Sequence, residues 1–375
     1  MATNDSKDEI LLDVRGLTKS FVAKTTFFGR PTSYVQAVDD VSFQIHKGEC
    51  FGLVGESGCG KSTIGKMIVG LLRPTKGEIW FEGKNITALS EKERRAYCKD
   101  IQLIFQDPYA SLNPRMTIGN IIAEPIRTNN ILPDDQVEKR VDELLECVGL
   151  APYMRNRYPH EFSGGQRQRV GIARALAVNP KLIVCDEPVS ALDVSIQAQV
   201  LNLLDDLKDQ FGLTYLFIAH GLNVVKHISD RVGVMYLGKL MEIADEHELY
   251  HEPLCPYTQA LLSAIPSTDP TLRRRRIILE GDVPSPIDPP AGCRFASRCF
   301  AKIGACDVAA ADLTEQVPGH WCACHRYANA NTPEEVKKVA MQIQYEAARP
   351  TYGRGRTNEN GDPIDQEPNS AEQAS

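Results

Sequence analysis

The sequence has little that would suit it to binding nucleic acid or to crossing a membrane. Its 49 acidic residues outnumber its 42 basic residues, so the formal net charge is −7 and the basic excess that nucleic-acid binding needs is absent. No stretch approaches the roughly 18 uncharged apolar residues of a membrane-spanning helix. The first nine residues are polar and acidic, without the basic-then-apolar order of a secretory signal. We therefore expect a cytoplasmic protein that binds no nucleic acid and reaches a membrane only through partners.

The pattern of apolar residues predicts an α/β fold. Short apolar runs at 50–54, 101–105, 182–185, 215–219 and 232–235 alternate with helical stretches, as in a parallel sheet flanked by helices. Alternating patterns between about residues 10 and 48 predict antiparallel strands. Residues 107–160 have helical periodicity and no clear strand. We therefore predict a mainly parallel sheet with an antiparallel β-subdomain and an inserted helical subdomain.

A glycine-rich segment, Gly55-Glu-Ser-Gly-Cys-Gly-Lys61-Ser62, follows the predicted strand at 50–54 and opens a helical stretch. In this context Gly-x4-Gly-Lys-Ser is the phosphate-binding loop of a P-loop NTPase. Backbone N–H groups and the helix N-terminus would surround the phosphates, Lys61 would add positive charge, and the Ser62 hydroxyl would bind Mg²⁺. The alternative, a glycine-rich turn without a ligand, would not explain why Lys61 and Ser62 follow the glycines at the spacing of this motif. The residues expected to contact ATP here are Gly55, Glu56, Ser57, Gly58, Cys59, Gly60, Lys61, Ser62 and Thr63.

Two acidic residues, Asp186 and Glu187, end the apolar run that begins at Leu182. The Asp186 carboxylate, on the same sheet as the phosphate loop, can hold Mg²⁺. Glu187 would orient and deprotonate the attacking water. The structural alternative is an Asp-Glu-Pro turn, because Pro188 stops any regular element. Beside a phosphate loop we favour the catalytic interpretation.

A second glycine-rich segment, Phe162-Ser-Gly-Gly-Gln166, precedes a predicted helix at 167–177. Ser163 and Gln166 have the spacing of a capping box, which is the structural interpretation. A capping box does not require Gly164 and Gly165, however. We expect these glycines to bring the backbone close to another group, and a capped helix N-terminus attracts an anion.

Together these segments resemble the ATP-binding subunits of ABC transporters, over roughly residues 10–330. The resemblance implies an ATPase whose two nucleotide domains face head to tail, so that each signature segment closes over the ATP of the other subunit. Gly221 departs from the family pattern, in which many relatives have an acidic residue after the histidine. The positions that the resemblance adds are Ser163, Gly164, Gly165 and Gln166 (the signature, with Phe162 in place of the usual Leu), Gln106 (a ligand of Mg²⁺ in the Q-loop), Asp193 (D-loop), His220 (the switch histidine at the γ-phosphate) and Phe21 (stacking on adenine, with Tyr34 as a rival).

A finer resemblance points to the oligopeptide/dipeptide permease branch. It rests on residues 189–199, 256–262 and 292–299 and on the insertion at 25–34. It implies import of peptides with two transmembrane permease subunits, a second ATPase subunit in a heterodimer rather than a homodimer, and indirectly a substrate-binding protein. The chain would lie peripherally on the cytoplasmic face of the inner membrane. The alternatives are import of nickel or another small solute, or a soluble ABC ATPase without a transport role.

Five cysteines lie close together in the C-terminal part of the sequence, whereas the other six, Cys255 among them, are scattered singly. In a reducing cytoplasm such clustering argues for metal binding rather than disulfides, and thiolates suit Zn²⁺ or an iron–sulfur cluster. The branch's C-terminal extension is associated with a [4Fe-4S] cluster. The alternative is a set of buried, inert thiols. The cysteines that match the cluster positions are Cys293, Cys299, Cys306 and Cys324, with Cys322 as the spare.

These observations divide the chain into three parts. Residues 10–252 would form the ATP-binding domain, with the helical subdomain at about 107–175. Residues 253–330 would form the Cys-rich C-terminal extension. Residues 331–375 are expected to be a polar tail, largely disordered, because aliphatic residues nearly vanish from about 350 onward.

Overall fold

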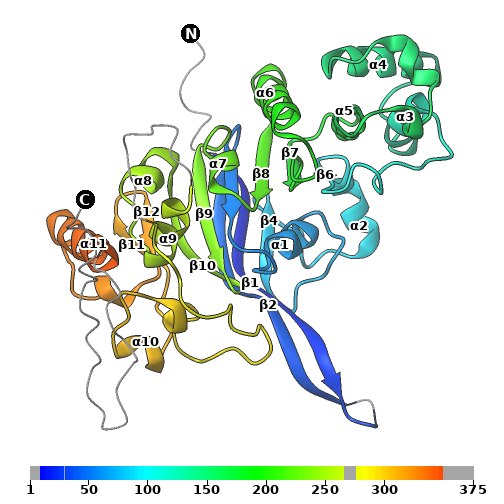
Figure 1. Cartoon of the computed structure of the whole chain (residues 1–375). Coiled ribbons are helices and arrows are strands. Elements are labelled where there is room, and N and C mark those ends of the chain that lie inside the picture. Colours follow the sequence, from blue (N-terminus) through cyan, green and yellow to red (C-terminus); the bar gives the residue numbers. More distant parts are fainter. Residues whose placement is uncertain (1–8, 29, 266–275, 349–375) are drawn as a thin grey trace, which may run out of the picture.

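The structure, a computed structural model, describes residues 9–28, 30–265 and 276–348. Two sheets organise it (Figure 1). The strands are β1 (Ile10–Thr25), β2 (Pro31–His46), β3 (Cys50–Val54), β4 (Lys76–Phe81), β5 (Lys84–Asn85), β6 (Ile101–Ile104), β7 (Leu182–Asp186), β8 (Thr214–Ala219), β9 (Arg231–Tyr236), β10 (Lys239–Asp245), β11 (Thr314–Val317) and β12 (His320–Cys322). The α-helices are α1 (Lys61–Ile68), α2 (Glu91–Arg95), α3 (Ile118–Thr128), α4 (Asp134–Cys147), α5 (Gly164–Leu176), α6 (Val194–Phe211), α7 (Leu222–Val225), α8 (Glu246–His251), α9 (Pro256–Ser263), α10 (Ala305–Val308) and α11 (Pro333–Ala348).

The main sheet has the order β11-β12-β10-β9-β3-β8-β7-β6. Its strands β9, β3, β8, β7 and β6 are parallel, which confirms the runs predicted as buried parallel strands. Side chains alternate between its faces, as the two-residue period of a strand requires. Ile183 and Cys185 of β7 pack with the helices of one face, whereas Leu182 and Val184 pack with α1 and the second sheet. The strands are therefore buried on both faces.

The second sheet is antiparallel, with the order β2-β1-β4-β5. Its strands β1 and β2 have 16 residues each and pair along their length, and together they project from the body of the molecule as a long arm (Figure 1). The base of the arm packs against the main sheet through buried residues such as Leu12, Val41 and Phe51. The arm thus carries both aromatic residues considered for adenine, Phe21 and Tyr34.

Helices α3, α4 and α5 form a lobe between β6 and β7, at the opposite side of the molecule from the C-terminal helices (Figure 1). As the sequence predicted, no strand is found among residues 107–160, which the structure describes in full. Isoleucines at 118, 122 and 126 recur every four residues and are buried where α3 meets α4 and α5. In the described part of the chain, no helix is long and apolar enough to cross a membrane.

The C-terminal segment is continuous with the core instead of standing apart. Strand β12 pairs with β10 through Glu242 and Cys322, so β11 and β12 extend the main sheet. The expectation of a disordered tail from residue 331 is wrong for its first part, because α11 is a packed helix that buries Val336 and Ile343. Its apolar residues follow a helical period that the surrounding charged residues obscured. Residues 349–375 lie outside the described part of the chain.

Candidate nucleotide-binding and catalytic site

The phosphate loop joins the end of β3 to the start of α1. Gly55, Gly58 and Gly60 have positive φ angles of 151°, 78° and 107°, which glycine adopts without strain. A Cβ atom at Gly60 would lie 2.1 Å from the carbonyl oxygen of Ala37. The N–H groups of the exposed Ser57 and Gly58 have no hydrogen-bond acceptor among the described residues. The loop therefore presents free donors beside a helix N-terminus, which is the arrangement that binds phosphate.

Lys61 lies in the centre of this loop and is 3% exposed. Its Nζ donates to the carbonyl oxygens of Gly55, at 2.7 Å, and Glu56, at 3.1 Å. These bonds hold the ammonium group inside the loop, where its charge complements a phosphate.

The next residue, Ser62, connects the loop to β7. Its hydroxyl donates to Oδ1 of Asp186 at 2.6 Å. Asp186 is 6% exposed at the end of β7. A hydroxyl and a carboxylate side by side, next to a phosphate loop, are the oxygen ligands that Mg²⁺ takes together with a nucleotide, so these residues fit the metal.

Glu187 is fixed by residues from two other strand ends. Its carboxylate accepts a hydrogen bond from Gln106 Nε2 and lies in contact with His220 Nε2, each at 2.6 Å. The side chain is 5% exposed, and its backbone has a φ of 50°, which a residue other than glycine rarely adopts. Such backbone strain gathers at functional sites because the surroundings must impose it. Three residues with different predicted roles in ATP hydrolysis, Gln106, Glu187 and His220, thus meet in one place although they are far apart in sequence.

The signature segment lies at the start of α5. Ser163 and Gln166 form the predicted capping box: the Ser163 hydroxyl accepts from the Gln166 N–H at 3.3 Å, and the Gln166 Oε1 accepts from the Ser163 N–H at 3.0 Å. A Cβ at Gly165 would lie 2.5 Å from Ile196 Cγ2. Close packing against Ile196 of the same chain therefore explains why this position is a glycine. No hydrogen bond joins residues 163–166 to the phosphate loop in the described structure.

The remaining predicted positions lie at exposed places. Asp193 is the N-cap residue of α6, with an exposed side chain that caps no N–H group. Phe21 and Tyr34 are 39% and 42% exposed. Phe21 pairs with Val35, and Val22 pairs with Tyr34, so the two aromatic rings lie on opposite faces of the arm. Only one of them can therefore face a given nucleotide.

Sequence reasoning missed the residues that support the phosphate loop from the C-terminal segment. The Arg298 guanidinium lies 3.0 Å from the Glu56 carboxylate, and the Tyr257 hydroxyl accepts a hydrogen bond from the Glu56 N–H at 3.1 Å. These contacts join residues about 200 positions or more apart, so no local signal in the sequence points to them.

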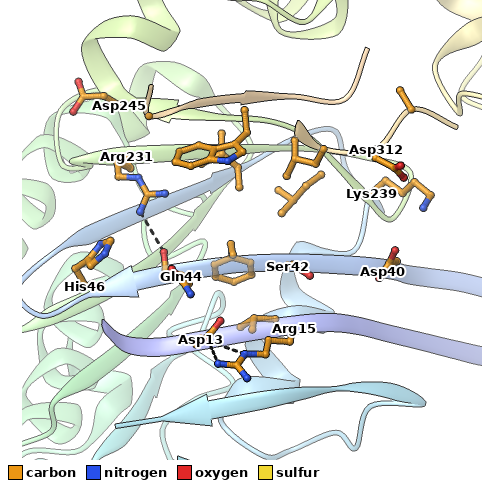
Figure 2. Close-up of a pocket in the computed structure, with 18 residues that line it drawn as sticks. Asp13, Arg15, Asp40, Ser42, Gln44, His46, Arg231, Lys239, Asp245 and Asp312 are labelled. Atoms are coloured by element: carbon orange, nitrogen blue, oxygen red, sulfur yellow. Dashed lines mark hydrogen bonds and ion pairs between the residues drawn. The ribbon is translucent and has the colours of Figure 1, made fainter. Parts of the chain in front are cut away.

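A cavity of about 950 Å³ lies between the two sheets and is lined by Arg15, Arg231, Trp321 and neighbouring residues (Figure 2). No residue of the phosphate loop lines it. The Arg231 guanidinium lies 5.6 Å from the centre of the Phe51 ring and 5.7 Å from the Trp321 ring, and it pairs with Glu49 at 3.2 Å. Because this cation is already partnered, we assign the cavity no part in nucleotide binding.

The clustered cysteines come from several elements. The Cys293 N–H donates to the Cys306 carbonyl at 2.8 Å. Burial raises the pKa of the Cys293 thiol to about 11 and that of Cys299 to about 12, and it also raises the pKa of Cys324. Cys255, which stands alone in the sequence, is buried in the core against which these three cysteines pack.

These thiols, as they are placed, do not fit a metal. Among the described residues, which include every cysteine named above, no group of three or more His, Cys, Asp or Glu side chains is arranged to hold a metal ion. The predicted [4Fe-4S] cluster, or Zn²⁺, at Cys293, Cys299, Cys306 and Cys324 has no support in this arrangement.

Comparison with known proteins gives the family. Residues 38–190 match the ABC transporter family, and residues 241–306 match the oligopeptide/dipeptide transporter C-terminal region. The chain is 58% identical to the putative oligopeptide transport ATP-binding protein YkfD of Bacillus subtilis, over 81% of this chain and 93% of the relative. It is 54% identical to the oligopeptide transport ATP-binding protein AppF of the same organism, over 86% and 99%.

Solved structures agree with this result. The ATP-binding cassette MJ0796, in a dimeric post-hydrolysis state bound to ADP and Pi, aligns with a TM-score of 0.56 and 29% identity over 63% of this chain and 99% of that one. The protein is thus an ATPase that is coupled to transport. The geometry of the site and the fold agree with these relatives, and we conclude that this chain belongs to the ATP-binding subunits of ABC transporters, in the oligopeptide/dipeptide branch.

Proposed function

We propose that this protein hydrolyses ATP to energise the import of dipeptides or oligopeptides. The observation that carries the cargo assignment is the match of residues 241–306 to the oligopeptide/dipeptide transporter C-terminal region, together with relatives named for oligopeptide transport. Those names favour peptides over nickel or another small solute, and favour transport over a soluble role.

Each residue of the site has a proposed role. The phosphate loop, residues 55–63, binds the phosphates of ATP through its free N–H groups, such as those of Ser57 and Gly58, and through the Lys61 ammonium. Ser62, Asp186 and Gln106 hold Mg²⁺, which neutralises charge on the phosphate oxygens when it is bound. Glu187 takes a proton from the attacking water, and His220 holds the carboxylate and contacts the γ-phosphate. The contacts that support these roles are the bonds of 2.6 Å between Ser62 and Asp186 and around Glu187.

We further propose that the signature acts on the ATP of a second subunit. Within one chain the signature makes no hydrogen bond to the phosphate loop in the described structure, although the capped N-terminus of α5 is suited to an anion. Asp193 and the signature are both accessible to such a partner. The dimeric state of the related MJ0796 cassette supports this arrangement. The resemblance favours a paralogous second subunit, so that both ATP sites are shared between the two chains.

The remaining partners follow from the branch. We propose that two transmembrane permease subunits bind this chain on the cytoplasmic face of the membrane, and that a substrate-binding protein delivers cargo to them. The chain is then a peripheral subunit that does not touch the cargo.

Affinity purification of the Glu187→Gln variant from membranes in the presence of ATP tests the assembly. Recovery of two membrane-spanning subunits and a second ATPase is expected, and recovery of soluble partners alone would contradict the transport role. Reconstitution in vesicles of the same complex, assembled with the wild-type chain so that it can hydrolyse ATP, then tests the cargo. ATP-dependent uptake of a labelled tripeptide is expected, and uptake of Ni²⁺ without peptide uptake would reject the peptide assignment.

A further inference from the structure

Glu56, the second residue of the phosphate loop, is held from three directions. Both of its carboxylate oxygens accept from Arg298 Nη1, at 3.1 and 3.0 Å. Its N–H donates to the Tyr257 hydroxyl at 3.1 Å, and its carbonyl accepts from Lys61 Nζ at 3.1 Å. Tyr257 belongs to α9, and Arg298 follows the linker after that helix. Two residues outside the nucleotide-binding motifs thus fix the loop that the motifs define.

This support is itself rigidly built. The Tyr257 side chain is fully buried, with its ring centre 4.7 Å from that of Tyr236 and 5.2 Å from that of Phe295. Arg298 also donates to the Tyr236 hydroxyl at 3.4 Å. Among the described residues its buried Nε has no hydrogen-bond partner, a cost that the contacts at Nη1 must offset. The guanidinium is therefore held at Glu56 by packing as well as by charge.

Arg294 anchors the same segment to the arm. Its side chain is 4% exposed and donates to the carbonyl of Leu237 and to the side chains of Gln36 and Asp39. The turn at Ala296–Arg298 is thereby fixed relative to β2, whose Ala37 contacts Gly60 of the phosphate loop. A shift of this turn would consequently move the Arg298 contact with the loop.

The charges explain why the loop needs this support. Glu56 puts a carboxylate into a loop that is proposed to bind the most negatively charged part of ATP, and an unneutralised negative charge in that loop would disfavour binding. The side chains of Arg298 and Glu56 are 11% and 26% exposed, so water screens the pair only in part. The guanidinium neutralises the carboxylate, while the Glu56 carbonyl helps to aim the Lys61 ammonium.

We propose that the C-terminal segment is part of the nucleotide site, and that Arg298 and Tyr257 are positioning residues that neutralise and orient Glu56 for ATP binding. This inference rests on the nucleotide site proposed above. It assigns the segment after residue 253 a role in ATP binding that its resemblance to the branch does not imply.

The main test is ATP affinity and steady-state hydrolysis of the purified full-length chain. Arg298→Ala should raise the Kd and KM for ATP on the order of tenfold, the change expected for about 1.4 kcal/mol, with a smaller change in kcat. Adding Glu56→Gln to Arg298→Ala should restore most of the affinity, because the uncompensated charge is removed. Arg326→Ala is the matched control and should behave as wild type. Arg326 forms an ion pair with Glu346, at 2.8 Å, and this pair does not involve the phosphate loop.

Two further variants keep the proposal testable if Arg298→Ala fails to fold. In the Glu56→Gln background, adding Arg298→Ala should change ATP affinity by no more than about threefold, because the charge that Arg298 neutralises is already removed. Tyr257→Phe keeps the ring packing, removes the acceptor, and should weaken ATP binding several-fold. Wild-type affinity in Arg298→Ala, or a double variant as weak as the single one, would overturn the proposal. Failure of the nucleotide site itself would look different, since the wild-type chain would then bind no ATP.

Discussion

Replacing Glu187 by glutamine is the sharpest test of the catalytic site. In the structure both carboxylate oxygens have a contact of 2.6 Å, one a hydrogen bond from Gln106 Nε2 and the other with His220 Nε2. A glutamine can still accept from Gln106 through its oxygen. Its amide can donate to His220 Nε2 if that ring carries its proton on Nδ1. The shape and hydrogen bonds of the site are therefore kept, and the basic oxygen is the only function removed.

The expected loss follows from this geometry. A positioned general base contributes about 10²- to 10⁴-fold to a rate, so hydrolysis should fall by that factor, or about 2.7 to 5.5 kcal/mol in activation free energy. ATP binding should be unchanged, because Glu187 makes no hydrogen bond to Lys61 or Ser62 in the described structure. Ser190→Ala is the matched control. It removes a hydroxyl bonded to the Glu187 carbonyl at 3.1 Å and leaves the carboxylate in place.

The assay is single-turnover hydrolysis of ATP, with nucleotide affinity measured separately by fluorescence. We expect normal affinity with slow hydrolysis in Glu187→Gln, and hydrolysis within a few-fold of wild type in Ser190→Ala. Turnover near the wild-type rate in Glu187→Gln would refute the role of general base. A large loss of ATP affinity would instead show that the carboxylate builds the binding site.

Four further perturbations test other parts of the structure. Lys61→Ala should weaken ATP binding itself, measured with the same fluorescent nucleotide, and unchanged affinity would remove this residue from the phosphate site. Gly60→Ala should destabilise the chain by more than about 1 kcal/mol, because its φ is 107° and the added Cβ would lie 2.1 Å from the Ala37 carbonyl; an unchanged urea midpoint would contradict this. The Cys293 thiol, with its pKa raised to about 11 by burial, should be protonated at pH 8, so its alkylation rate should keep rising up to about pH 11, whereas rapid labelling at pH 8 would show a thiolate. Ile343→Ala should cost about 2 to 5 kcal/mol in unfolding free energy, since this side chain of α11 is fully buried.

Local chemistry made the phosphate loop predictable from the sequence. Gly55, Gly58 and Gly60 adopt backbone angles that favour glycine, and Lys61 and Ser62 have side chains with the required charge and hydroxyl. The strands β3, β7 and β8 were predictable for a similar reason, because strands buried on both faces are continuous apolar runs. The helix α11 was missed, since its few buried residues are separated by charged ones.

The sequence by itself thus determined the α/β fold, the phosphate loop and the family, because each depends on residue types at fixed local spacing. Only the tertiary structure decided which distant residues meet. It brings Gln106 and His220 to Glu187, and Arg298 to Glu56, across separations of up to 242 positions. It also makes β12 part of the main sheet and leaves the thiols without the arrangement of a metal site in the described chain. Such contacts depend on how whole elements pack, and no short-range pattern along the chain encodes them.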